Sequence, residues 1–192
     1  MTHWKKISGL TLLIVVFAHF YHNYLLGTPG NILWVCHISN LLLSAGLITN
    51  QAFPVRVSVP WIILGIPLWV MDMWLSETWM ITSLSTHLLG LLIALMAIYH
   101  YRARGTVWIY SWLYFLFFQL LAKLLTSPEL NVNVSHSIYG GMEHFIEDYR
   151  IYWMIIALFA ALCLWLVNYI LSRLFPQTDQ AEIKKKRQFF VS

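Results

Sequence analysis

Polar side chains that could do chemistry lie inside a strongly apolar stretch near residue 40. His37, Asn40 and Ser44 follow one another at spacings of three and four residues, so they share one face of a helix. Polar and ionisable groups are costly in hydrocarbon and normally turn toward a partner or an internal cavity. The stretch therefore predicts a polar site inside a bundle of helices.

A second helix face carries the residue types that proton abstraction requires. Ser83, His87 and Gly90 fall at the spacing of one helix face, and Thr86 lies beside them. A histidine beside a hydroxyl can act as the general base that makes the hydroxyl nucleophilic. A pure packing role for this face of small residues fits the same pattern equally well.

The histidines also permit a different site, one that binds a metal ion or a haem. His19 and His22 lie three residues apart on the first apolar segment, and His37 and His87 lie on the second and fourth. Four histidines from three helices can ligate such a centre. A haem needs facing histidines at equal depth, and only His19 and His37 clearly meet that condition. Cys36 points about 100° away from His37 on a helix, so we expect a packed thiol there.

Composition indicates an integral membrane protein. The chain has 192 residues, of which 59% are hydrophobic and 10% charged, whereas a soluble domain carries about 25% charged residues. A bilayer core about 30 Å thick needs roughly 20 apolar residues per helix. Six segments qualify, namely 7–26, 31–49, 57–75, 79–100, 107–126 and 151–175. We therefore predict an all-α, polytopic membrane protein built as a bundle of six transmembrane helices.

Basic residues determine the predicted orientation. If the N-terminus is cytoplasmic, ten of the twelve Lys and Arg residues lie on the cytoplasmic side, as the positive-inside rule requires. Both termini are then cytoplasmic, residues 1–175 form one transmembrane domain, and residues 176–192 form a basic cytoplasmic tail. The run Lys184–Arg187 is expected to bind anionic lipid headgroups. We expect no nucleic-acid partner.

The ionisable groups within the spans gather in the outer half of the predicted bundle. A rise of about 1.5 Å per residue puts His19, His37 and His87 roughly 10, 9 and 12 Å below the outer surface. Asp72 lies near the outer end of its helix, where we expect it to pair with Lys123 or to orient a histidine. This distribution predicts an outward-facing polar pocket.

The outer loop 127–150 is much longer than the other connections. It contains Asn131, Asn133 and the pair Gly140–Gly141, followed by a segment at 142–150 that predicts a short interfacial helix. Long loops in compact domains tend to be functional or disordered. We interpret this one as a lid over the pocket, although a surface loop with no task fits equally well.

Three short motifs resemble those of lipid-processing membrane proteins. They are Val35–Ser39, Ser85–Gly90, and Leu124–Thr126 followed by Asn131–Asn133. Their order resembles that of the YwaF-like integral membrane proteins, which have an animal branch of phospholipid acyltransferases. It is also similar to that of the androgen-induced six-helix lipid hydrolases, which use a membrane-embedded Thr and His.

The resemblance implies a polar centre made of His37, His87 and Asn131 or Asn133. Two features depart from the YwaF-like pattern. The cysteine precedes His37 instead of following it, and Val132 stands where a tyrosine is expected. The resemblance implies lipid chemistry without specifying the reaction.

Three functions remain open at this point. The first is an intramembrane enzyme that hydrolyses or transfers lipid acyl groups, with His87 as base, Ser83 or Thr86 as nucleophile, and His37 with Asn40 polarising the carbonyl. The second is the metal- or haem-binding protein described above, and the third is a non-catalytic carrier or assembly factor. We expect membrane lipids as partners and a multi-pass location in a bacterial inner membrane. The sequence specifies neither a cofactor nor an oligomeric state.

Overall fold

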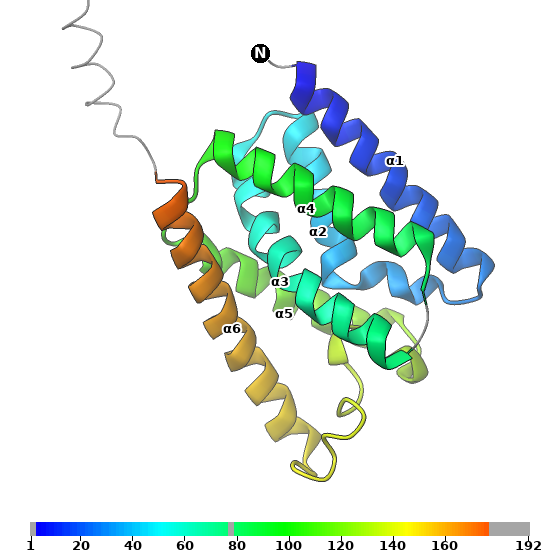
Figure 1. Ribbon diagram of the computed structural model, residues 1–192. Coiled ribbons are helices and arrows are strands. Elements are labelled where there is room, and N and C mark those ends of the chain that lie inside the picture. Colours follow the sequence, from blue (N-terminus) through cyan, green and yellow to red (C-terminus); the bar gives the residue numbers. More distant parts are fainter. Residues whose placement is uncertain (1–2, 77–78, 177–192) are drawn as a thin grey trace, which may run out of the picture.

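The chain folds into helices that run back and forth along one direction (Figure 1). The computed structural model describes residues 3–76 and 79–176, and no strand occurs within these ranges. The predicted basic tail lies outside the described residues from position 177 on. The elements are α1 (His3–Leu25), η1 (Pro29–Leu33), α2 (Val35–Ile48), α3 (Ala52–Ser76), α4 (Ile81–Tyr101), α5 (Val107–Leu125), η2 (Pro128–Leu130), η3 (Val132–Val134) and α6 (Tyr149–Leu174), where η denotes a 3-10 helix.

Five of the six α-helices, all except α2, are long and apolar enough to cross a membrane. Helix α2 has 14 residues and rises only about 21 Å, short of a hydrocarbon core about 30 Å thick. The predicted helix start at Asn31 was wrong. Pro29 begins a 3-10 helix, and Trp34 has a φ of −55° and a ψ of 131°, so the α-helix starts only at Val35. The missing length is replaced by the 3-10 helix η1.

Helix α3 is the central element, because it packs against α2, α4, α5 and α6. It begins at Ala52, before the predicted start at Val57, so Pro54 lies in its first turn. Pro60 and Pro67 both lie inside the helix. Each interior proline removes a helical hydrogen bond. Packing on several sides therefore has to compensate for two lost bonds.

Two apolar cores hold the bundle together. The larger core lies among α1, α2, α3 and α4, and its members include Leu12, Val16, Leu43, Val59 and Ala97. The second core joins α2 and α3 to α5 and α6, through Val35, Trp61, Phe115, Ala160 and Leu164. Figure 1 shows the result, with α6 set well apart from α1.

Indole and hydroxyl groups join the helices of the second core by hydrogen bonds. The Trp61 Nε1–H donates to the Ser111 carbonyl at 2.8 Å, and the Ser111 Oγ donates to the Val57 carbonyl at 2.8 Å. The Trp112 Nε1–H donates to the Ala157 carbonyl at 2.9 Å. Such bonds between helices are a common source of cohesion in membrane proteins.

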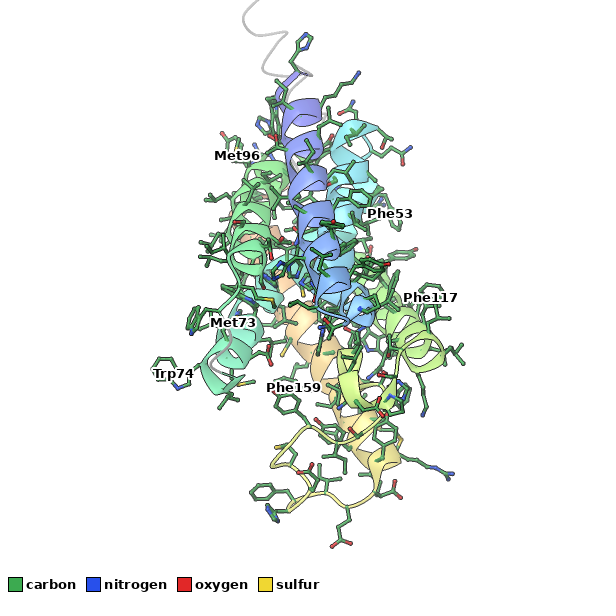
Figure 2. The ribbon with its side chains drawn as sticks, turned by 90° about the vertical axis from the view of Figure 1, so that its right-hand side faces the viewer. Phe53, Met73, Trp74, Met96, Phe117 and Phe159 are labelled. Carbon is green, nitrogen blue, oxygen red and sulfur yellow. The ribbon has the colours of Figure 1, made fainter. Side chains whose placement is uncertain are left out.

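Large apolar side chains cover the outside of the bundle. Phe53, Trp74, Met96, Phe117 and Phe159 are each at least 50% exposed, and Figure 2 shows them pointing outward. An apolar exterior on several long helices is compatible with a multi-pass integral membrane protein.

The long loop before α6 lies at the end of the bundle opposite the N-terminus (Figure 1). The interfacial helix predicted at 142–150 was wrong, because residues 142–148 contain only a turn at 143–145 and α6 starts only at Tyr149. The Asp148 side chain caps α6 by accepting hydrogen bonds from the backbone N–H groups of Arg150 and Ile151. A strong N-cap at this position explains why the helix begins there.

Candidate metal centre

Three imidazole rings from three helices meet inside the bundle. His19 of α1 lies 4.5 Å from His37 of α2, and His37 lies 5.5 Å from His87 of α4, measured between ring centroids. Their exposed fractions are 1%, 6% and 3%. These three side chains form the histidine cluster, and the mutual packing of α1, α2 and α4 brings them together.

Both ring nitrogens of His19 already have partners. Its Nε2 lies 3.2 Å from the Asn23 Nδ2, which can only donate, so Nε2 accepts. Its Nδ1 therefore carries the hydrogen and donates to the Thr82 Oγ1 at 3.0 Å. His19 thus has no free lone pair for a metal ion, and within the cluster its ring packs against the ring of His37.

The other two rings present a free lone pair. The Nδ1 of His37 lies 3.0 Å from the Asn31 carbonyl, and the Nδ1 of His87 lies 2.9 Å from the Ser83 carbonyl. A carbonyl can only accept, so each Nδ1 carries the hydrogen and each Nε2 carries the lone pair. The His87 Nε2 is buried without a hydrogen-bond partner among the described residues. Metal-ligating histidines are commonly oriented by this kind of backbone hydrogen bond.

Cys36 completes a group of three donors. Its sulfur and one ligand atom each of His37 and His87 all lie within 4.8 Å of one another. The expectation of a thiol that merely packs was based on the angle between Cys36 and His37 around α2. Because an imidazole reaches farther than a thiol, its nitrogen can lie beside the sulfur of a neighbouring residue. The donor group is therefore Cys36, His37 and His87.

Trp69 is a further residue of the site that the sequence analysis missed. Its ring stacks on His87 with a centroid distance of 4.6 Å and an interplanar angle of 11°. Its Nε1–H donates to the Ser83 Oγ at 2.9 Å. The indole thus fixes the plane of the His87 ring and shields it from the outside. No sequence pattern pointed to this role, because the inward face of α3, where Met73 lies one turn after Trp69, is known only from the structure.

The candidate nucleophiles are engaged elsewhere. The Ser83 Oγ accepts from Trp69, and the Thr86 Oγ1 donates to the Thr82 carbonyl at 2.8 Å. Neither hydroxyl forms a hydrogen bond with His87 in the described part of the chain. This arrangement does not contain the hydroxyl–histidine pair that acyl transfer needs.

Asn40 lies at the contact between α2 and α4. Its Nδ2 donates to the Cys36 carbonyl at 3.1 Å, and its backbone carbonyl accepts from the Ser44 Oγ at 2.9 Å. Its Oδ1 faces Gly90, which has no side chain to obstruct it. Asn40 therefore packs closely against α4 at Gly90, while both of its hydrogen bonds stay within α2.

The remaining predicted site residues lie outside the cluster. His22 makes no ring contact with the other three histidines within the described ranges. Asp72 accepts a hydrogen bond from the Tyr139 hydroxyl at 3.4 Å, and Lys123 lies over the Tyr149 ring at 5.0 Å. The predicted pairing of Asp72 with Lys123 was wrong.

Partial burial and the nearby Asp72 raise the pKa of Tyr139, which keeps the phenol protonated as a donor.

The outer loop is attached directly to the start of α2. The Asn133 Oδ1 accepts from the Val35 N–H at 2.9 Å, and its Nδ2 donates to the Leu33 carbonyl at 2.8 Å. The Gln119 Nε2 donates to the Asn133 carbonyl at 3.0 Å. Asn133 thus caps α2 immediately before Cys36 and His37, and it does not itself touch the histidine cluster.

Comparison with known protein families, with curated proteins and with solved structures finds no match for this chain. The resemblance described above therefore rests on its short motifs alone, and function has to be argued from the site.

Proposed function

We propose that this chain is an integral membrane protein that binds one copper(I) ion through Cys36, His37 and His87. The observation that carries the proposal is the convergence of one sulfur and two ring nitrogens within 4.8 Å of one another in the bundle interior. Sulfur and imidazole nitrogen are the donors that copper and zinc prefer in proteins. The buried, unpartnered Nε2 of His87 supports a role as a ligand.

The spacing of the donors suits an ion of this size after a small contraction. Nitrogen and sulfur ligands lie about 2.0 and 2.3 Å from such an ion, so two donors can be at most about 4.3 Å apart. The donors here lie within 4.8 Å of one another. Small rotations of the side chains bring them into coordination distance, while the hydrogen bonds on each Nδ1 keep the rings facing inward.

Charge balance favours copper(I) over zinc(II). A thiolate and two neutral imidazoles carry one negative charge, which a monovalent ion cancels and a divalent ion reverses. A net charge is costly in an apolar interior. Three donors also satisfy a trigonal copper site, whereas a structural zinc site takes four ligands. Binding releases the Cys36 proton, since only the thiolate is a good ligand.

The two other predicted functions receive less support from the geometry. A haem between His19 and His37 has no room, because their ring centroids are 4.5 Å apart. A lipid hydrolase or acyltransferase would need a hydroxyl bonded to His87, and none of the described residues supplies one. The topology we propose keeps both termini cytoplasmic in a bacterial inner membrane, with the site in the outer half of the bundle.

Metal content of matched variants tests the proposal. We expect about one copper per chain in the detergent-purified protein after growth with copper, measured by mass spectrometry of the elements. Cys36→Ser and His87→Gln should lose this copper and weaken copper(I) affinity by more than about 100-fold in competition with a chelator, because loss of an outer-sphere partner alone costs about 10- to 100-fold. Absorption at the copper edge should show one sulfur and two nitrogen neighbours.

The controls are the other cysteine and a histidine outside the cluster. Cys163→Ser and His22→Gln should keep the copper, because neither residue contributes to the donor group. Equal losses in Cys36→Ser and Cys163→Ser would indicate unspecific binding to thiols. Stoichiometric zinc in place of copper would contradict the charge argument, and a wild-type protein that takes up no metal would refute the site.

A further inference from the structure

A cleft of about 460 Å³ lies between α5 and α6, next to the outer loop. It shares no residue with the proposed copper site. Its polar lining comes from both helices and from the loop, through Gln119, Lys123, Ser135 and Arg150. Its apolar lining comes from Leu120, Trp153 and Met154. The cleft is therefore lined partly by polar and charged side chains and partly by apolar ones.

Two positive charges mark the outer end of the cleft. Lys123 lies in the last turn of α5, and Arg150 lies in the first turn of α6. Both side chains are exposed, and neither forms an ion pair with an acidic residue of the described ranges. The Lys123 Nζ lies over the ring of Tyr149, another residue of the cleft wall. The pair is suited to bind an anion such as a phosphate.

Two buried polar atoms in the wall of the cleft have no partner. Gln119 and Ser135 are 2% and 1% exposed, yet the Gln119 Oε1 and the Ser135 Oγ make no hydrogen bond within the described part of the chain. A buried polar atom without a partner costs about 1–3 kcal/mol. Both atoms belong to residues that line the cleft, so a small movement of the cleft wall would let polar groups of a ligand pair with them.

The orientation of Gln119 limits what that ligand can be. Its Nε2 donates to the Asn133 carbonyl, so the unpartnered atom is an oxygen that can only accept. Gln119 lies one helical turn, about 6 Å, deeper than Lys123. A ligand that pairs with this oxygen and with Lys123 would carry a hydrogen-bond donor about 6 Å below its anionic group.

Apolar surface continues from the cleft along the outside of the two helices. Leu120 is 59% exposed and Met154 is 51% exposed, and Trp153 also lines the cleft. This surface would face the acyl chains of a surrounding bilayer. A hydrocarbon chain that leaves the cleft toward the membrane interior could pack against this apolar surface.

We propose that the cleft binds a monoacyl glycerophospholipid, with its phosphate between Lys123 and Arg150 and its free glycerol hydroxyl donating to the Gln119 Oε1. The Ser135 hydroxyl donates to a phosphate oxygen, and the single acyl chain lies along Leu120 and Met154. A diacyl lipid fits less well, because an ester replaces the hydroxyl and an ester oxygen cannot donate to Gln119.

Native mass spectrometry of the delipidated protein with oleoyl lysophosphatidic acid tests this proposal. We expect a single bound lipid, and roughly tenfold weaker binding of both the 2-deoxy analogue and dioleoyl phosphatidic acid, because each leaves the Gln119 Oε1 unpaired. The double variant Lys123→Gln/Arg150→Gln should bind lysophosphatidic acid at least about tenfold more weakly. The matched double variant Lys6→Gln/Arg173→Gln removes the same charge elsewhere and should bind as the wild type does.

Ser135→Ala gives an independent readout that a folding defect does not mimic. Its Oγ has no partner among the residues that the structure describes, so the delipidated variant should melt at or above the wild-type temperature, while the rise in melting temperature on lipid addition becomes smaller. Equal affinity for the 2-deoxy analogue, or equal losses in both double variants, would overturn the proposal. Full displacement of the lipid by inorganic phosphate would reassign the cleft to a soluble anion.

Discussion

Gly90→Ala is expected to lower the melting temperature and to remove the copper, although Gly90 is not a ligand. A Cβ added at Gly90 would overlap the Asn40 Oδ1 and would lie 2.9 Å from its Cγ. The Asn40 amide cannot easily retreat, because its Nδ2 is bonded to the Cys36 carbonyl. Overpacking of this kind costs about 1–3 kcal/mol. It pushes α4, which carries His87, away from α2, which carries the other two donors.

Thermal unfolding in detergent and copper analysis of the same preparation measure both effects. Gly105→Ala is the matched control, because no atom lies within 4 Å of a Cβ added there. Adding Asn40→Ala to the Gly90→Ala variant removes the clash and should restore part of the stability. If Gly90→Ala melts like the wild type and retains its copper, close contact between α2 and α4 is not what assembles the donors.

Asn133→Ala is expected to reduce the free energy of unfolding by about 3–4 kcal/mol, because it leaves two backbone groups at the start of α2 without their partners. Asn133 is 2% exposed, so water cannot readily replace its side chain. Its φ is +54°, a left-handed conformation that alanine adopts less readily than asparagine. Copper affinity should fall as well, because the start of α2 carries Cys36 and His37.

Unfolding in mixed micelles gives the free energy, and hydrogen exchange of the Val35 N–H reports directly on the lost bond. Asn131→Ala is the control. Asn131 is also left-handed, with a φ of +40°, but among residues 3–76 and 79–176 its side chain bonds only within the loop, at His136 and Ser137. We expect a smaller loss of stability there and unchanged exchange at Val35. Equal effects of the two variants would mean that Asn133 has no special role in holding α2.

Hydropathy and the periodicity of polar residues were sufficient to predict most of the helices and to place His19, His37 and His87 at similar depths. The length of α2 escaped prediction because apolar composition does not distinguish a 3-10 helix and an extended residue from an α-helix at 29–34. Hydropathy responds to the apolar character of a segment, while the hydrogen-bonding pattern of its backbone depends on tertiary contacts such as those of Asn133.

The composition of the site was harder to predict than its location. Depth along a helix follows from counting residues, so the three histidines could be placed at similar levels. Whether a histidine can bind the metal ion depends on which of its ring nitrogens is free. For His37 and His87, the carbonyls of Asn31 and Ser83 occupy Nδ1 and leave Nε2 free. The composition of the site also depends on the reach of the imidazoles, which brings Cys36 into the group. The stacking of Trp69 requires the packing of α3 against α4, which no local pattern encodes.

The shortness of α2 bears on how quickly an ion could enter or leave. Because α2 starts late, its first turn, with Cys36 and His37, lies beneath a layer formed by η1 and η3 and held by Asn133. An ion in the site would pass through this layer instead of passing between full-length helices. The residence time of copper would then be set by the opening rate of two 3-10 helices, and a tight seal would make exchange slow even where the affinity is modest.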